Sequence, residues 1–259
     1  MRILLTNDDG ITAPGIVALY KELIKFAEVS VVAPDQVQSA CGHGITIREP
    51  LTIKKTDVDG VFEGWAVRGK PADCVKLGLG KLVEHQPDLV VSGINDGANV
   101  GINVLYSGTV AGAAEGAIHG IPSIAISQLW AEVGDTVFTE AARLSRLIVE
   151  NYGKSVMAGN HPCPLLNVNF PNVTDERPMG MKVASQATHR TDDEYKRVTG
   201  SNGQPEFLLQ GWFKDHGPPE HDLRALIDGY VVLTPLHVDM TDHAKMKAIA
   251  DWEWPDLTR

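Results

Sequence analysis

The sequence predicts an α/β protein with a mostly parallel β-sheet that helices cover on both faces. Up to about residue 170, short apolar runs alternate with segments of helical periodicity. The apolar runs carry hydrophobic residues at successive positions, which is typical of strands buried on both faces. The composition, 43% hydrophobic and 22% charged in 259 residues, indicates a globular protein that buries a sizeable core.

The expected core elements follow one another from the N-terminus. Pro14 opens the first helix, and Ile16, Leu19 and Leu23 lie on one face of it. Pro34 ends the second strand. We expect strands at residues 2–6, 29–33, 88–92, 123–127 and 165–169, strand-like alternation over 45–67, and helices at 14–26, 71–84, 109–119 and 136–151.

The C-terminal part of the chain has a different composition. From residue 186 to about residue 221 it is rich in Asp, Lys, Gly, Pro and His, which indicates an extended arm or long hairpin. Isolated aromatic residues there need a partner surface and favour self-association, with a floppy loop as the alternative: Tyr195, Phe207, Trp212 and Phe213. A short helix or turn at 222–230 and a strand at 231–234 follow. We therefore expect a single domain, 1–259, with an α/β core at 1–185 and an arm with C-terminal elements at 186–259.

The charge balance limits the class of partner. Lys and Arg number 23 against 33 Asp and Glu, for a formal net charge of −10. This surplus argues against a protein that binds the phosphate backbone of a nucleic-acid polymer. A small anionic substrate remains compatible, because a bound divalent cation can reverse the local field.

Cysteine usage and the N-terminal segment indicate a cytoplasmic protein. Cys41, Cys74 and Cys163 form no CxxC pair and are typical of reduced thiols. The N-terminal apolar run is too short for a signal peptide. No run of about twenty apolar residues is present to span a membrane.

Polar segments follow three of the expected strands. They comprise residues 7–10 after the first strand, 33–44 after the second, and 93–101 after the strand at 88–92, continuing to 106–109. Ligands of an open parallel sheet bind beyond the carboxyl ends of its strands. We therefore expect these segments to meet at one edge of the sheet.

Two adjacent carboxylates, Asp8 and Asp9, stand in the first of these segments. Carboxylates side by side repel each other, so a cation beside them is an economical explanation. Hard oxygen ligands favour Mg²⁺, Mn²⁺ or Ca²⁺ over zinc. A solvated turn is the alternative, since Asn-Asp-Asp-Gly also suits a turn.

The segment Ser107-Gly108-Thr109 opens a helix of small residues. Backbone N–H groups and hydroxyls at a helix N-terminus suit a phosphate, although simple N-capping is the alternative. The preceding loop is rich in glycine, which allows close approach of a ligand, and its Asn95 and Asn99 offer neutral amides.

Several familiar motifs are missing. Gly-x-Gly-x-x-Gly does not follow the first strand, no GxxxxGK[ST] occurs, and no histidine pair has HExxH or HxH spacing. A dehalogenase-type phosphatase would need an aspartate where Asn7 stands, and an amide cannot form the aspartyl-phosphate.

Characteristic motifs are distributed over almost the whole chain. They are Leu4-Leu5-Thr6-Asn7-Asp8-Asp9-Gly10, Ala13-Pro14-Gly15, Ala33-Pro34-Asp35 with Ser39 and Gly42, Pro71-Ala72-Asp73-Cys74-Val75, Gly93-Ile94-Asn95 with Gly97, Asn99 and Gly101, Tyr106-Ser107-Gly108-Thr109-Val110 with Ala113-Ala114-Glu115-Gly116, Leu166-Asn167-Val168-Asn169, and Thr234-Pro235-Leu236 with Asp239 and Thr241. In this order they resemble the SurE family of metal-dependent nucleotidases and phosphatases.

The resemblance implies a Rossmann-like α/β fold with a projecting arm used in dimers or tetramers. It also implies hydrolysis of nucleoside 5′- and 3′-monophosphates, sometimes of short polyphosphate, with one divalent cation per subunit, Mg²⁺ or Mn²⁺. The family's metal ligands correspond here to Asp8, Asp9, Ser39 and Asn95. We expect Asp8 or Asp9 to act as general base, and these residues to hold the phosphate: Asn95, Asn99, Ser107, Gly108 and Thr109.

Three positions depart from the family pattern. They are Lys70, Asn103 and Val232, where members commonly carry Thr, Asp and Ser. They bear on specificity more than on activity, and Lys70 either touches the leaving group or is solvated. Two alternative functions stay open at this stage, a nucleotide sensor without turnover and a metal-dependent deacetylase with His43 as a ligand.

Overall fold

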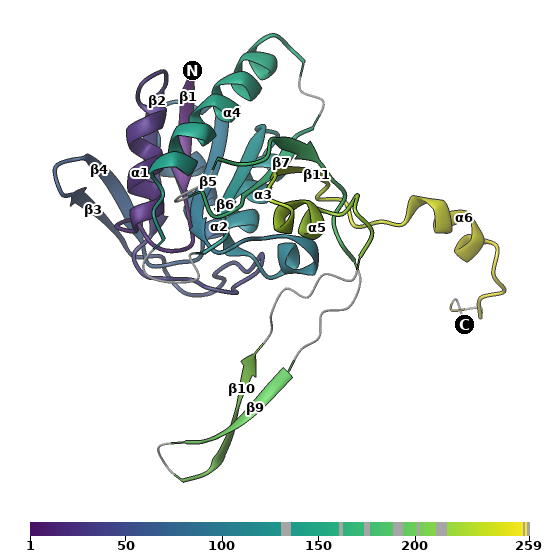
Figure 1. Cartoon of the computed structure of the whole chain (residues 1–259). Coiled ribbons are helices and arrows are strands. Elements are labelled where there is room, and N and C mark those ends of the chain that lie inside the picture. Colours follow the sequence, from purple (N-terminus) through teal and green to yellow (C-terminus); the bar gives the residue numbers. More distant parts are fainter. Residues whose placement is uncertain are drawn as a thin grey trace.

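The computed structural model describes residues 1–130, 136–160, 163–173, 177–188, 194–200, 203–210, 217–255 and 257. Its centre is a nine-stranded sheet in the order β3-β4-β2-β1-β5-β6-β7-β11-β8, with helices on both faces (Figure 1). Five neighbouring pairs from β4 to β7 are parallel. The expected α/β class with a mostly parallel sheet is confirmed.

The strands of this sheet are short. They are β1 Arg2–Thr6, β2 Glu28–Pro34, β3 Ile53–Val58, β4 Phe62–Val67, β5 Leu89–Asp96, β6 Ser123–Gln128, β7 Leu165–Phe170, β8 Met181–Val183 and β11 Val231–Leu236. A separate antiparallel pair consists of β9 Glu194–Thr199 and β10 Pro205–Gln210.

The α-helices are α1 Pro14–Leu23, α2 Pro71–Leu77, α3 Gly108–Ile118, α4 Thr139–Met157, α5 Asp222–Ile227 and α6 His243–Ala250. A π-helical turn, Gly78–Leu82, continues α2, and a 3₁₀ turn, Gly101–Leu105, precedes α3. No described helix is long and apolar enough to cross a membrane.

The apolar strands serve two cores, one on each face of the sheet. Along β1, Ile3 and Leu5 pack with α1 and α4, whereas Leu4 packs with α2 on the opposite face. Because successive side chains of a strand point to opposite faces, a strand covered on both sides is apolar at most successive positions, as β1 is from Ile3 to Leu5. This explains the uninterrupted hydrophobic runs of the sequence.

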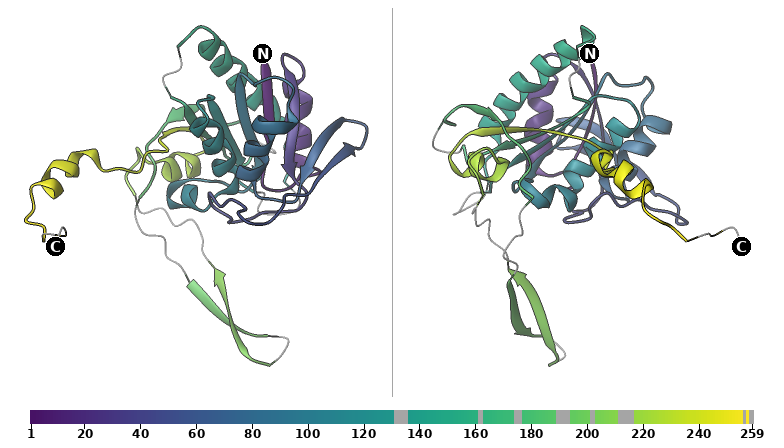
Figure 2. Two further views of the ribbon diagram at one scale, coloured as in Figure 1. Left: turned by 180° about the vertical axis from the view of Figure 1, so that it is seen from behind. Right: turned by 90° about the vertical axis from the view of Figure 1, so that its right-hand side faces the viewer.

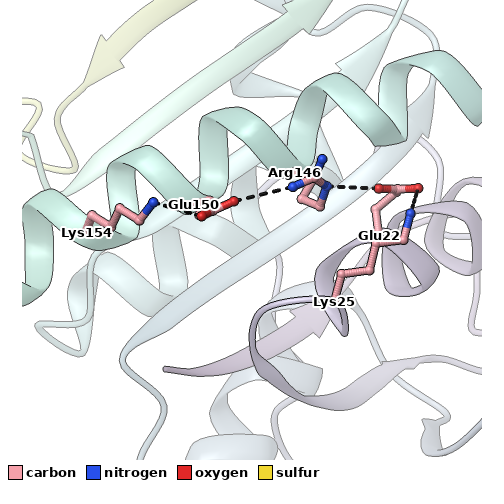
Figure 3. A network of polar contacts seen from close by, with 5 residues as sticks. All are labelled: Glu22, Lys25, Arg146, Glu150 and Lys154. Carbon is pink, nitrogen blue, oxygen red and sulfur yellow. Dashed lines mark hydrogen bonds and ion pairs between the residues drawn. The ribbon is translucent and has the colours of Figure 1, made fainter.

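Helices α1 and α4 lie side by side on one face and are joined by an ionic chain (Figure 3). Arg146 of α4 contacts Glu22 of α1 at 3.1 Å and Glu150 of its own helix at 3.4 Å. Lys25 and Lys154 extend the chain at its two ends. These partly exposed pairs orient the two helices but stabilise them only modestly.

Element bounds differ from expectation at several places. The helix expected at 71–84 is α-helical only to Leu77, and the alternation over 45–67 forms strands only from Ile53 onward. Helix α4 starts later and ends later than expected. The short strand β8 and helix α6 were not expected from the pattern, β8 because three residues carry too little periodicity.

The C-terminal part contributes to two regions of the molecule. Strand β11 pairs antiparallel with β7 inside the main sheet. The β9–β10 hairpin projects away from the body, and α6 lies apart from it with no buried residue (Figures 1 and 2). Of the four aromatic residues expected on the arm, Tyr195 and Phe207 are exposed on this hairpin, and Trp212 and Phe213 lie outside the described residues.

Candidate metal and phosphate site

Asp8 and Asp9 lie beyond the carboxyl end of β1, between the ends of β2 and β5. Asp8 is 6% exposed, and burial raises its pKa despite hydrogen bonds that lower it. Burial, and next the charge of Asp8, raise the pKa of Asp9 to about 6. Two partly buried carboxylates of like charge are unfavourable together unless a cation offsets their repulsion.

The loop after β2 is attached to this pair. The backbone carbonyl of Asp8 accepts the N–H of Gln38 at 2.8 Å, which places Ser39 next to the carboxylate segment. Ser39 itself is exposed at the rim. Further along, the N–H of Gly42 donates to the carbonyl of Tyr106 at 2.9 Å, so the same loop reaches the segment that opens α3.

The end of β5 brings an amide to the same place. The N–H of Asp96 donates to the carboxylate of Asp9 at 3.2 Å, so Asn95 is adjacent to this contact. The Asn95 amide nitrogen donates to the carbonyl of Gly97 at 2.6 Å. Its carbonyl oxygen is therefore the side-chain atom that suits a cation.

The first turn of α3 closes the site on a third side. The Thr109 hydroxyl donates a hydrogen bond to the Asp8 carboxylate, and the Thr109 backbone N–H also bonds Asp8. Ser107 caps the helix, its hydroxyl accepting the N–H of Val110 at 3.0 Å. A Cβ at position 108 would lie 2.8 Å from Cβ of Asp8 and 2.9 Å from Sγ of Cys41, so only glycine allows this approach.

Asn99 is placed differently from the other residues that the sequence singled out. It is buried, and its amide nitrogen donates to the Ser127 hydroxyl at 2.8 Å. Its backbone carbonyl accepts hydrogen bonds from the side chains of Asn167 and Asn169. Asn99 thus fastens the loop after β5 to β6 and β7, and a direct contact with phosphate stays a prediction.

Glu115 of α3 is a buried carboxylate that sequence reasoning did not single out for the site. His43 lies 2.8 Å from it, Lys76 lies 2.9 Å from it, and His119 lies 3.2 Å from it. Burial alone raises the pKa of Glu115, but hydrogen bonds from His43 and Lys76 outweigh it and lower the pKa to about 2. In the sequence, this cluster is signalled by His119, which stands four residues after Glu115 on the same helix. His43 and Lys76 are distant in the chain and carry no such signal.

Each of the three residues that depart from the family pattern has contacts of its own in the structure. Lys70 caps α2 and places Nζ 3.5 Å from the carbonyl of Ile45. The carbonyl of Asn103 accepts the N–H groups of Tyr106 and Ser107, both at 3.0 Å. Val232 is buried in an apolar cluster beneath the loop after β5.

Similarity to known proteins agrees with this geometry. The family model described as Survival protein SurE matches residues 3–193. The chain belongs to the SurE family. SurE relatives include the protein named 5′-nucleotidase SurE of Heliobacterium modesticaldum, 42% identical over 97% of this chain and 92% of that protein. The protein of the same name from Desulforamulus reducens is 44% identical over 97% of this chain and 98% of its own length.

A solved SurE structure has the same fold. The crystal structure of the SurE protein from Aquifex aeolicus superposes with a TM-score of 0.81 at 40% identity, covering 96% of this chain and 98% of that chain. The two folds therefore correspond over nearly the whole length of both chains.

The donor set of this SurE chain fits a hard divalent cation. Within the described residues, no group of three or more His, Cys, Asp and Glu side chains is arranged to hold a metal ion by itself. The buried side-chain oxygen of Asn7, next to the carboxylate pair, has no hydrogen-bond partner in the part of the chain that the structure describes. Carboxylate, hydroxyl and amide oxygens of Asp8, Asp9, Ser39 and Asn95 are ligands that Mg²⁺ and Mn²⁺ prefer.

Proposed function

We propose that this chain is a metal-dependent phosphomonoesterase that hydrolyses nucleoside 5′-monophosphates, and 3′-monophosphates, to nucleoside and phosphate. The curated relatives that match this chain over nearly their full lengths are named 5′-nucleotidase SurE. The observation that carries the proposal is the contact between Thr109 and Asp8. It joins the candidate cation ligands to the helix start that suits a phosphate.

We assign the cation to Asp8, Asp9, Ser39 and Asn95, with one Mg²⁺ or Mn²⁺ per subunit. When bound, such an ion supplies Lewis-acid stabilisation of phosphate oxygens and lowers the pKa of water. Asp8 is already engaged by Thr109, whereas Asp9 is more exposed. Asp9 is therefore the better placed of the two carboxylates to take a proton from an attacking water.

The phosphate would lie at the first turn of α3. The aligned peptide dipoles of the helix give its N-terminus a partial positive charge. Ser107 and Gly108 stand at this terminus, and Asn95 stands near the end of β5, next to the contact between Asp96 and Asp9. These groups would hold phosphate oxygens as charge develops in the transition state, which is the principal electrostatic contribution in such reactions.

The deacetylase alternative is not favoured by the placement of His43, its candidate histidine ligand. Nε2 of His43 faces Glu115 at 2.8 Å instead of the Asp8–Asp9 pair. A sensor without turnover is not favoured by the names of the relatives. A sensor would bind AMP without releasing phosphate, and this distinguishes it from an enzyme.

We also propose that the chain acts in the cytoplasm as a homo-oligomer, a dimer or tetramer, through its C-terminal arm. Supporting this, Cys41, Cys74 and Cys163 are free thiols. On the hairpin, the register pairs Tyr195 with Leu209, so that both lie with Phe207 on one face. All three side chains are more than half exposed, which favours burial against another copy.

Phosphate release from a panel of nucleotides and short polyphosphate, with Mg²⁺, Mn²⁺ or EDTA, tests the proposed activity. The Asp8→Asn variant should lose several powers of ten in rate, roughly the scale of removing an essential charged group. Asp57→Asn, which removes an exposed carboxylate of β3 that accepts the N–H of Gly60, is the matched control and should retain activity. An Asp8→Asn variant with near-full, metal-dependent activity contradicts the assignment.

A further inference from the structure

A carboxylate outside the candidate site is buried completely. Asp222, the first residue of α5, has 0% exposure. Its Oδ2 accepts the N–H of Gly101 at 2.8 Å, and its Oδ1 accepts the N–H groups of Ala187 at 2.9 Å and of Leu223 at 2.8 Å. Three backbone donors from three different segments thus converge on one buried side chain.

Gly101 is held at both of its backbone polar groups. Its N–H donates to Asp222, and its carbonyl accepts the side-chain amide of Gln186 at 2.8 Å. Its φ is +58°, and a Cβ there would lie 3.2 Å from the carbonyl of Ala187. A glycine is needed for so close an approach in the left-handed region.

The two residues that hold Gly101 stand at the two ends of the arm. Gln186 precedes the β9–β10 hairpin and Asp222 follows it. The segments that lead into and out of the arm, residues 184–187 and 220–222, meet and are called the arm root. Ser185 and His221 form a parallel bridge there, and the N–H of Asp222 donates to the carbonyl of Ser185 at 2.8 Å. The arm root therefore forms one unit that contacts Gly101.

Gly101 in turn belongs to the loop that leads to the phosphate-facing end of α3. The carbonyl of Val100 accepts the N–H of Asn103, and the carbonyl of Asn103 accepts those of Tyr106 and Ser107. Successive hydrogen-bonded turns thus connect Gly101 to the N-cap of α3. Apolar packing adds to this, since Ala98 and Val100 share a buried cluster with Ala187 and Leu223.

We propose that Asp222 is a positioning residue that fixes the phosphate-binding loop, residues 97–107, to the root of the arm. The inference rests on the proposed function for the meaning of that loop. Asp222 acts through Gly101, because its carboxylate contacts the loop backbone and the arm backbone at the same time. A change in the arm root is thereby transmitted to the helix start at Ser107.

The Asp222→Asn variant tests this with almost no change of side-chain shape. Its amide nitrogen must face at least one backbone N–H, so a donor meets a donor and one carboxylate contact is lost. Asp228→Asn is the matched control, since it removes a carboxylate from the end of the same helix that pairs with Arg224 at the surface. Gln186→Ala, which removes the other bond to Gly101, is the milder second variant should Asp222→Asn fail to fold.

Two readouts separate positioning from general destabilisation. We expect Asp222→Asn to raise KM for AMP about tenfold, with a smaller change of kcat, as loss of one phosphate-orienting contact would. We expect amide exchange in the peptide covering 97–107 to rise by about tenfold or more, while peptides from β1 keep their protection. Binding of Mn²⁺, which depends on Asp8 and Asp9, should be unchanged.

Each contrary result has a distinct meaning. Unchanged amide exchange at 97–107 in Asp222→Asn would show that Asp222 does not hold the loop. Wild-type KM and kcat despite faster exchange would show that the position of the loop does not affect the reaction. Either result overturns the proposal. If the wild-type protein releases no phosphate from any nucleotide, the proposed function fails separately. The comparison is then made on the affinity for inorganic phosphate in the presence of Mn²⁺, where equal affinities of wild type and variant overturn the positioning by Asp222.

Discussion

The hydroxyl of Thr109 donates a hydrogen bond to the carboxylate of Asp8, which joins the first turn of α3 to the end of β1. The two residues are 101 positions apart in the chain. Both are buried, so the bond is shielded from water. A candidate cation ligand and a candidate phosphate site are thereby held in one rigid unit, which is the preorganisation that electrostatic catalysis requires.

Removing this hydroxyl should impair the reaction without removing a carboxylate. In Thr109→Val, Asp8 loses a donor in a buried site, so kcat/KM for AMP should fall about tenfold or more. Thr109→Ser retains the hydroxyl and should keep most of the activity. Phosphate release with saturating Mn²⁺ is the measurement, and a valine variant within about twofold of wild type would show that the bond is dispensable.

Asp9 should destabilise the metal-free protein. Burial and the charge of Asp8 raise its pKa to about 6, so the folded state binds a proton that the unfolded state releases near pH 4. Stability of the metal-free protein should therefore decrease as the pH rises from about 4 to about 6. Asp9→Asn should raise the Tm of the metal-free protein at pH 7 by about 2–4 °C, the scale of 1 kcal/mol for a chain of this size.

A cation should reverse the effect of Asp9. Mn²⁺ binds the folded state, so it should raise the Tm of the wild type and leave the Tm of Asp9→Asn nearly unchanged. Glu63→Gln removes an exposed carboxylate of β4 that pairs with Lys55 of β3 and serves as the control. An equal Mn²⁺-dependent rise in wild type and Asp9→Asn would exclude Asp9 as a ligand.

Glu115 should contribute to stability at neutral pH and lose that contribution in acid. Its pKa of about 2 lies below its value of 4.5 in the unfolded chain, so the unfolded state takes up the proton first as the pH falls. Between pH 7 and pH 3 this group should account for a loss of about 2 kcal/mol. In urea unfolding, the difference in free energy of unfolding between wild type and Glu115→Gln should decrease by about that amount from pH 7 to pH 3. A difference that stays constant would contradict the pairing.

The apolar face of the β9–β10 hairpin should govern assembly. Replacing Tyr195 and Phe207 by serine removes two exposed aromatic side chains from one face, so the molar mass in light scattering should fall to that of a smaller species. Lys196→Ser changes the opposite face and is the control. An unchanged mass in the aromatic double variant would place the interface elsewhere.

Much of the fold is predictable because β1 and β6 have apolar centres, Ile3–Leu5 and Ile124–Ile126, and helices such as α1 have an apolar stripe. The bounds of β1 agree with expectation, since a buried strand between polar segments leaves little choice. The pairing of β11 with β7 in antiparallel direction was not predictable from its sequence. Strand direction depends on where the chain travels beforehand, which an apolar pattern does not record.

The site divides in the same way. The sequence identifies Asp8, Asp9 and Asn95 as candidates, because carboxylates and amides after buried strands meet at one edge of a parallel sheet. It does not distinguish Asn95 at the rim from Asn99, which is buried against Ser127. Both are asparagines in one glycine-rich loop, and only the path of that loop separates them.

By itself, the sequence determined the α/β class, the edge of the sheet at which the candidate site residues meet, and the acidic pair suited to a hard cation. The tertiary structure decided which distant groups meet: Thr109 with Asp8, His43 with Glu115, and Asp222 with Gly101. The physical reason is the separation in sequence over which each kind of interaction acts. Hydrophobic periodicity and turn chemistry act between residues close in sequence, whereas hydrogen bonds between separate segments exist only once the packed sheet and helices bring them within about 3 Å.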